Sequence, residues 1–82
     1  MFTVVQCRAA RALLGWSMTD LAQAAQIGIM TLNRFEGGET VRVESQHKIR
    51  DALVQAGVEI IAAGDASADG GEGVRLVLNP QR

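Results

Sequence analysis

The stretch Ser17–Gly38, SMTDLAQAAQIGIMTLNRFEGG, decides the fold of this 82-residue chain. Its first part has apolar residues at helical spacing, which would form one face of a helix: Leu21, Ala22 and Ala25. This pattern predicts a helix over about residues 18–25. Ser17 stands just before it, and a serine hydroxyl at that position can accept a backbone N–H group of the first turn.

The second part of the stretch predicts another short helix, over about residues 29–36. Leu32 and Phe35 are spaced to face inward, Gly28 precedes the helix, and Gly37-Gly38 ends it. Small residues on the first helix would let the two helices cross closely at a steep angle. Two short helices joined by a tight turn in this way are typical of a helix-turn-helix.

A helix is also expected before this stretch, over about residues 4–14. Thr3 and Gln6 have the spacing of a capping box, in which each side chain accepts the other residue's backbone N–H group. The apolar periodicity predicts that Arg8 and Gln6 face outward. The same periodicity predicts an inner stripe of four residues: Val5, Ala9, Ala12 and Leu13.

After the stretch, one further helix is predicted over about residues 44–56, and the character of the chain then changes. Residues 58–62 and 74–78 are rich in β-branched and apolar side chains and predict two strands. We therefore divide the chain into a helix-turn-helix domain, residues 1–57, and a β tail, residues 58–82, with a mobile acidic Gly-rich loop over residues 64–73. Because an isolated two-stranded ribbon is marginally stable, the tail must pack on the helices or pair with a partner chain, and we favour self-association.

The expected fold is mainly α, with four to five helices and a short C-terminal β segment.

Composition excludes several function classes. Cys7 is the only cysteine and there is one histidine, so we expect no catalytic constellation, metal site or cofactor, and no enzyme. No apolar run is long enough to span a membrane and no signal peptide is evident, which favours a cytoplasmic protein.

Charge is unevenly placed along the chain, although the formal net charge is only −1. Residues 1–50 carry six arginine or lysine and four acidic residues, whereas residues 51–82 carry two and five. A nucleic-acid surface would therefore belong to the first part, although the bias is mild.

Five segments in this order resemble the Cro/C1-type (XRE-like) helix-turn-helix regulators of phages and bacteria: CRAARALLGWS, DLAQAA, TLNRFEGGE, IRDALVQAGVEII and GVRLVL. The resemblance covers nearly the whole chain. It implies a lambda-repressor-like domain that regulates transcription, as a repressor or an activator. It also implies a homodimer on a palindromic operator in double-stranded DNA, with residues 29–36 in the major groove as the recognition helix.

The resemblance also implies roles for individual residues. The expected base contacts come from Ile29, Met30, Thr31, Asn33 and Arg34. The expected phosphate contacts come from the backbone N–H groups around Gly37 and Gly38 and from the side chains of Thr40, Arg42 and Lys48. A structural ion pair is expected between Arg11 on the first helix and Glu36 at the end of the recognition helix.

The chain also departs from the family pattern. Met18 stands where a glutamine is common, and Gln26 stands where a glycine is common, so Gln26 must adopt a left-handed conformation or a different turn. Ile29 and Met30 begin the recognition helix where polar residues are usual. Together with Met18 they would form an exposed apolar patch, which supports an alternative: a protein-interaction module, antiactivator or antitoxin-like, with a protein partner and little DNA binding.

Overall fold

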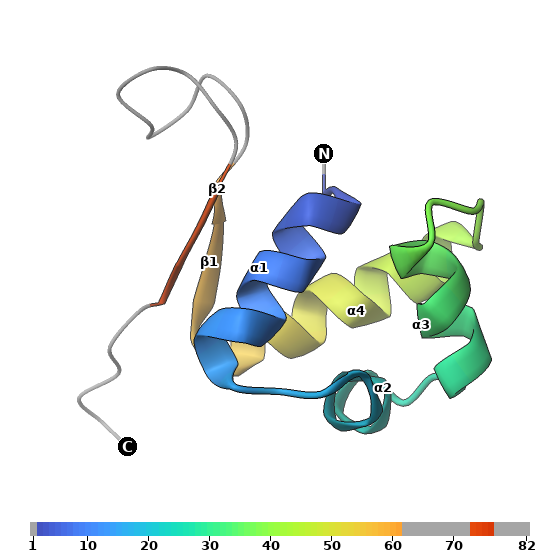
Figure 1. The fold of residues 1–82 in the computed structure, drawn as a ribbon, viewed down its shortest axis with the longest axis horizontal. Helices are drawn as coiled ribbons and strands as arrows, with labels where there is room; N and C mark the ends of the chain where they lie inside the picture. The colour runs from blue at the N-terminus through green and yellow to red at the C-terminus, as the bar shows by residue number, and fades with distance from the viewer. Residues whose placement is uncertain (1, 62–72, 77–82) are drawn as a thin grey trace.

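The computed structural model describes residues 2–61 and 73–76. In these residues the chain forms four helices followed by a two-stranded antiparallel sheet (Figure 1). The elements are α1 (Val4–Leu14), α2 (Met18–Ala25), α3 (Ile29–Glu36), α4 (Val43–Gln55), β1 (Val58–Ile61) and β2 (Gly73–Leu76). The predicted fold class, mainly helical with a short C-terminal β segment, is confirmed.

Helix α1 begins and ends at the residues that the sequence indicates. Thr3 and Gln6 form the predicted capping box: the Thr3 hydroxyl accepts the Gln6 N–H at 3.2 Å, and Gln6 Oε1 accepts the Thr3 N–H at 3.0 Å. Gly15 ends the helix in a left-handed conformation with a φ of 69°. That conformation is available to glycine at little cost, because glycine has no Cβ atom.

The buried face of α1 differs from the predicted one. Gln6, Cys7 and Ala10 are buried, whereas Val5 is 66% exposed and Leu13 is also exposed. The helix is therefore rotated relative to the stripe that apolar periodicity predicts. The prediction was wrong because hydrogen-bond acceptors from distant parts of the chain stabilise Gln6 in a buried position.

These partners lie on the β ribbon. Gln6 Nε2 donates to the backbone carbonyl of Ile61 at 2.7 Å and to that of Gly73 at 3.0 Å. Together with the bond that Oε1 accepts from Thr3, this gives the buried amide a partner at each end. A buried amide without such partners would be destabilising, so the capping side chain also fastens the ribbon to α1.

Helices α2 and α3 form the helix-turn-helix. Ser17 caps α2 together with Asp20, and Gln26 ends it in a left-handed conformation with a φ of 58°. Gln26 thus takes the backbone geometry that a glycine would adopt more readily, the first of the two possibilities that the sequence leaves open. Gly28 then caps α3 without any side-chain hydrogen bond.

Helix α4 completes the helical core and begins at Val43, one residue earlier than predicted. Side chains from all four helices and from β1 meet in one cluster. The largest fully buried apolar side chains in it are Leu21, Leu32, Ile49, Leu53 and Val58.

Strands β1 and β2 pair with Val58 opposite Leu76 and Ile61 opposite Gly73. The ribbon packs on α1 and α4, and Figure 1 shows it on the side of the molecule away from α3. Because Val58 belongs to the common core, the tail packs as part of the helical domain in the described residues. The predicted loop up to residue 72 and the predicted end of the second strand, residues 77–78, lie outside the described residues.

Candidate nucleic-acid interface

Helix α3 presents one face to the core and the other to solvent. Leu32 and Phe35 are buried, as the periodicity predicts. Four of the five residues expected to reach bases are exposed on the opposite face: Ile29, Met30, Asn33 and Arg34. The fifth, Thr31, is half-buried. The first two turns of the helix are therefore accessible to a partner.

Beside this face lies a cavity of about 420 Å³. Its lining residues come from α3, from the loop that follows and from the first turn of α4: Thr31, Arg34, Thr40, Val41, Arg42 and Ser45. The lining thus includes two arginine residues and three residues that carry a hydroxyl group. Such a set can hold a phosphate group through charge and hydrogen bonding.

The cavity joins two base-contact candidates, Thr31 and Arg34, to two phosphate-contact candidates, Thr40 and Arg42. Ser45 also lines it, and the sequence analysis did not include this residue. Its position in the first turn of α4, just after the polar loop, is the signal that could have identified it.

The backbone N–H groups of Gly37 and Gly38 are not available in the way expected. Gly37 N–H donates to the carbonyl of Asn33 at 2.9 Å, and Gly38 N–H donates to that of Phe35 at 3.1 Å. Both groups are engaged in ending α3, because a helix leaves its last carbonyls without intrahelical partners. Both glycines are exposed, so this turn can offer close approach to a phosphate but not unpaired donors.

Lys48 does not line the cavity. It contributes to a second hollow, of about 290 Å³, between the end of α2 and the outer side of α4. Gln26, Asp51 and Gln55 also line that hollow. Lys48 therefore lies apart from Thr40 and Arg42, the two other side chains expected to contact phosphate.

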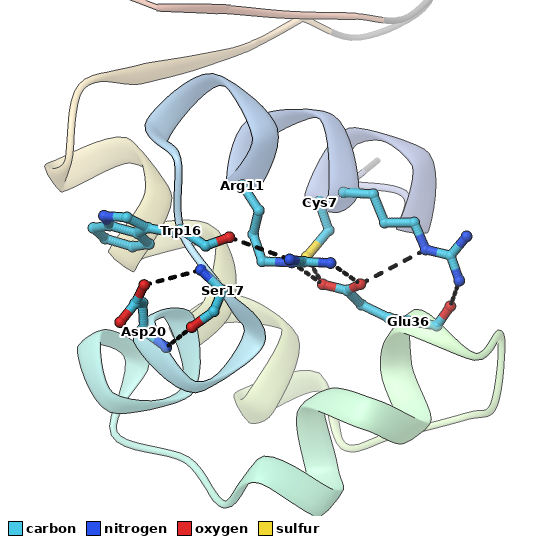
Figure 2. Close-up of polar contacts among 7 residues, drawn as sticks. Cys7, Arg11, Trp16, Ser17, Asp20 and Glu36 are labelled. Carbon is cyan, nitrogen blue, oxygen red and sulfur yellow. Dashed lines mark hydrogen bonds and ion pairs between the residues drawn. The ribbon is translucent and has the colours of Figure 1, made fainter.

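The expected partners Arg11 and Glu36 form an ion pair that ties α1 to the end of α3 (Figure 2). Arg11 Nε lies 2.8 Å from Glu36 Oε2, and Arg11 Nη2 lies 2.8 Å from Oε1, so the contact is bidentate. Arg11 also donates to the Trp16 carbonyl at 3.2 Å. This geometry fixes both the distance and the orientation of the carboxylate.

Two further residues of α1 contact the same carboxylate group. Cys7 Sγ donates to Glu36 Oε2 at 3.3 Å, and Arg8 Nε lies 3.6 Å from Oε1.

Burial by itself opposes ionisation of Glu36, but the hydrogen bonds from Arg11 and Cys7 and the two guanidinium charges outweigh it and lower its pKa. Burial raises the pKa of the Cys7 thiol well above its ordinary range, and the neighbouring Glu36 carboxylate raises it further. The thiol is therefore a hydrogen-bond donor here and not a thiolate.

The apolar patch at the start of α3 is smaller than expected. Ile29 and Met30 are exposed, Met30 to 68%. Met18 is only partly exposed and packs against the core, because it is the first residue of α2 and its side chain reaches the helical cluster. The exposed patch therefore consists of two adjacent residues of α3.

No cluster of three or more His, Cys, Asp or Glu side chains suited to holding a metal ion occurs in residues 2–61 and 73–76. None of the helices formed there has the length and apolar character needed to cross a membrane.

No protein-family model matches the chain, and a search of curated proteins gives no match.

Proposed function

We propose that the protein is a sequence-specific DNA-binding transcriptional regulator of the Cro/C1 type, with α3 as its recognition helix. One observation carries the proposal: the exposed face of α3 adjoins a cavity lined by Arg34, Arg42 and three residues that carry a hydroxyl group. A helix face that can reach base edges, beside a cationic site that can hold the DNA backbone, is what major-groove recognition requires.

The chemistry of the exposed residues defines what they could recognise. Asn33 can donate to and accept from adenine, and Arg34 can form two hydrogen bonds with guanine or bind a phosphate. Ile29 and Met30 offer apolar contact, for which a thymine methyl group is suitable. Thr40, Arg42 and Ser45 then hold the neighbouring phosphate and set the register of the helix in the groove.

We further propose that the protein acts in the cytoplasm as a homodimer on a palindromic operator. A single short recognition helix reads few base pairs, so useful selectivity needs two half-sites about one helical turn apart. Within the described residues each strand of the ribbon has one neighbour, so β2 has an edge with no strand beside it. Such an edge readily pairs with another chain.

Fluorescence anisotropy with the protein's own promoter DNA and a scrambled duplex, over a series of salt concentrations, tests the proposal. We expect selective binding of the promoter and a steep loss of affinity with salt, because neutralised phosphates release counterions. The double variant Asn33→Ala/Arg34→Ala should abolish the selectivity, since each good base contact contributes about 1–3 kcal/mol. Arg50→Ala, which removes one charge from an exposed position outside the cavity lining, is the matched control and should keep it.

The exposed pair Ile29 and Met30 favours a second candidate, a protein-interaction module that keeps this fold but reads little DNA. Equal and weak binding to both duplexes would support it. In that case Ile29→Ser/Met30→Ser should abolish capture of the protein partner, whereas Asn33→Ala/Arg34→Ala should leave it intact.

A further inference from the structure

The last carbonyl groups of α3 are all accounted for by hydrogen bonds. Three of them accept N–H groups from the turn that follows the helix: Asn33 O from Gly37, Phe35 O from Gly38 and Arg34 O from Glu39. The fourth is the carbonyl of Glu36, and its donor comes from another helix. Arg8 Nη2 on α1 donates to this oxygen at 2.8 Å.

Arg8 therefore caps α3 from outside the helix. Its positive charge lies at the C-terminus of α3, where the helix dipole favours a cation. The second contact, 3.6 Å from Arg8 Nε to Glu36 Oε1, keeps the guanidinium group beside the same residue. Yet the Arg8 side chain is 61% exposed, so it is not held in place by burial.

Arg8 and Arg11 bind Glu36 in different ways. On Glu36, Arg11 binds only the carboxylate, which can move with the side-chain torsions. Arg8 lies 3.6 Å from the carboxylate and also donates to the main-chain carbonyl, which moves only with the helix. Together the two contacts restrain α3 as a body relative to α1. Sequence periodicity places Arg8 on the solvent side of α1 and gives no sign of this role.

We propose that Arg8 is a positioning residue for α3: it fixes the C-terminal end of the helix and thereby the angle at which its first turns are presented to DNA. The effect on DNA rests on the proposed function. A helix of eight residues is about 12 Å long, so a tilt of about 10° at the Glu36 end displaces the first turn by about 2 Å. A displacement of that size breaks a hydrogen bond to a base edge.

Two measurements on Arg8→Ala test the proposal, with Arg50→Ala as a control for the lost charge. In the free protein, hydrogen exchange at the Gly37, Gly38 and Glu39 amides should become several-fold faster in Arg8→Ala but not in Arg50→Ala. The reason is that the turn formed by these residues loses the contact between Arg8 and the Glu36 carbonyl. Affinity for the promoter should fall about tenfold, while the slope of affinity against salt stays unchanged, because Arg8 contacts no phosphate in this view. Far-UV circular dichroism checks that the variant is folded.

Arg8→Lys provides the rescue. Lysine keeps the charge and can still donate to the Glu36 carbonyl, so it should restore most of the exchange protection and most of the affinity. A role in general stability alone would not give this pattern, because at a temperature where every variant is folded the affinity would not change.

Several outcomes would overturn the proposal. A salt slope reduced by about one in Arg8→Ala, with exchange unchanged, would make Arg8 a phosphate contact. Exchange that is unchanged in Arg8→Ala rejects the anchoring of α3, and unchanged affinity rejects its consequence for DNA. If the wild-type protein binds neither duplex, the proposed function fails, and the exchange measurement still decides whether Arg8 anchors α3.

Discussion

At the scale of single residues, Glu36 is the point at which α1 and α3 are joined. Its carboxylate is buried and receives Arg11 and Cys7, and its carbonyl receives Arg8. A buried carboxylate is stable in the ionised form only while these donors surround it, and removing one partner of such a pair is strongly destabilising. The contacts that join α1 to α3 therefore require Glu36 to be deprotonated.

This makes stability depend on pH in a defined direction. The folded state lowers the pKa of Glu36, so it binds fewer protons than the unfolded state in the acid range. The stabilisation is fully present above the pKa of the unfolded chain and is lost as the pH falls through the lowered pKa of the folded state. We expect the free energy of unfolding, measured with urea, to decrease from about pH 5 downward.

Glu36→Gln should be less stable than the wild type at neutral pH and should lose much of this acid dependence. Glu39→Gln removes one carboxylate from the exposed loop after α3 and is the matched control. An acid dependence as steep in Glu36→Gln as in the wild type would contradict the lowered pKa.

At the scale of elements, two helices end in left-handed conformations with different residues. Gly15 ends α1 with a φ of 69°, and Gln26 ends α2 with a φ of 58°. A side chain at such a position brings its Cβ atom close to the backbone, which costs about 1–2 kcal/mol per residue. Replacing Gln26 by glycine should therefore remove this cost, and replacing Gly15 by alanine should introduce it.

We expect Gln26→Gly to stabilise the protein by about 1 kcal/mol and Gly15→Ala to destabilise it by a similar amount. No atom lies within 4 Å of a Cβ atom built at Gly15, so the loss would come from the backbone and not from a clash. Urea denaturation of the two single variants at neutral pH measures both effects. Destabilisation by Gln26→Gly would show instead that contacts of the Gln26 side chain outweigh the strain.

The elements themselves could be predicted because their signals are local. Caps at Thr3 and Ser17, glycines at helix ends and apolar spacing all act within a few residues of the structure they determine. The rotation of α1 could not be predicted in this way, because it depends on acceptors 55 and 67 residues beyond Gln6. The anchoring by Arg8 and the place of Ser45 in the cavity depend on tertiary contacts in the same way.

In the molecule as a whole, the ribbon and α3 lie on different sides of α1. If β2 pairs with a second copy, as we propose, the α3 faces of both copies remain accessible. The Leu76 side chain on β2 is 45% exposed and would contribute to such a contact.

Sedimentation velocity should therefore show a dimer that Leu76→Asp converts to a monomer, because a buried unpaired charge opposes association. Val54 on α4 is exposed to a similar extent, 43%, so Val54→Asp is the matched control and should remain a dimer. A wild-type monomer at micromolar concentration, or equal effects of the two variants, would contradict pairing through β2.

The contacts of Gln6 also have a consequence for the order of events during synthesis. The side chain that completes the first turn of α1 donates to the carbonyl of Gly73, which is synthesised 67 residues after Gln6. Until then one donor of this buried amide has no native acceptor, and that deficit disfavours the final packing of α1. The native packing of α1 is therefore completed only after Gly73 has been synthesised.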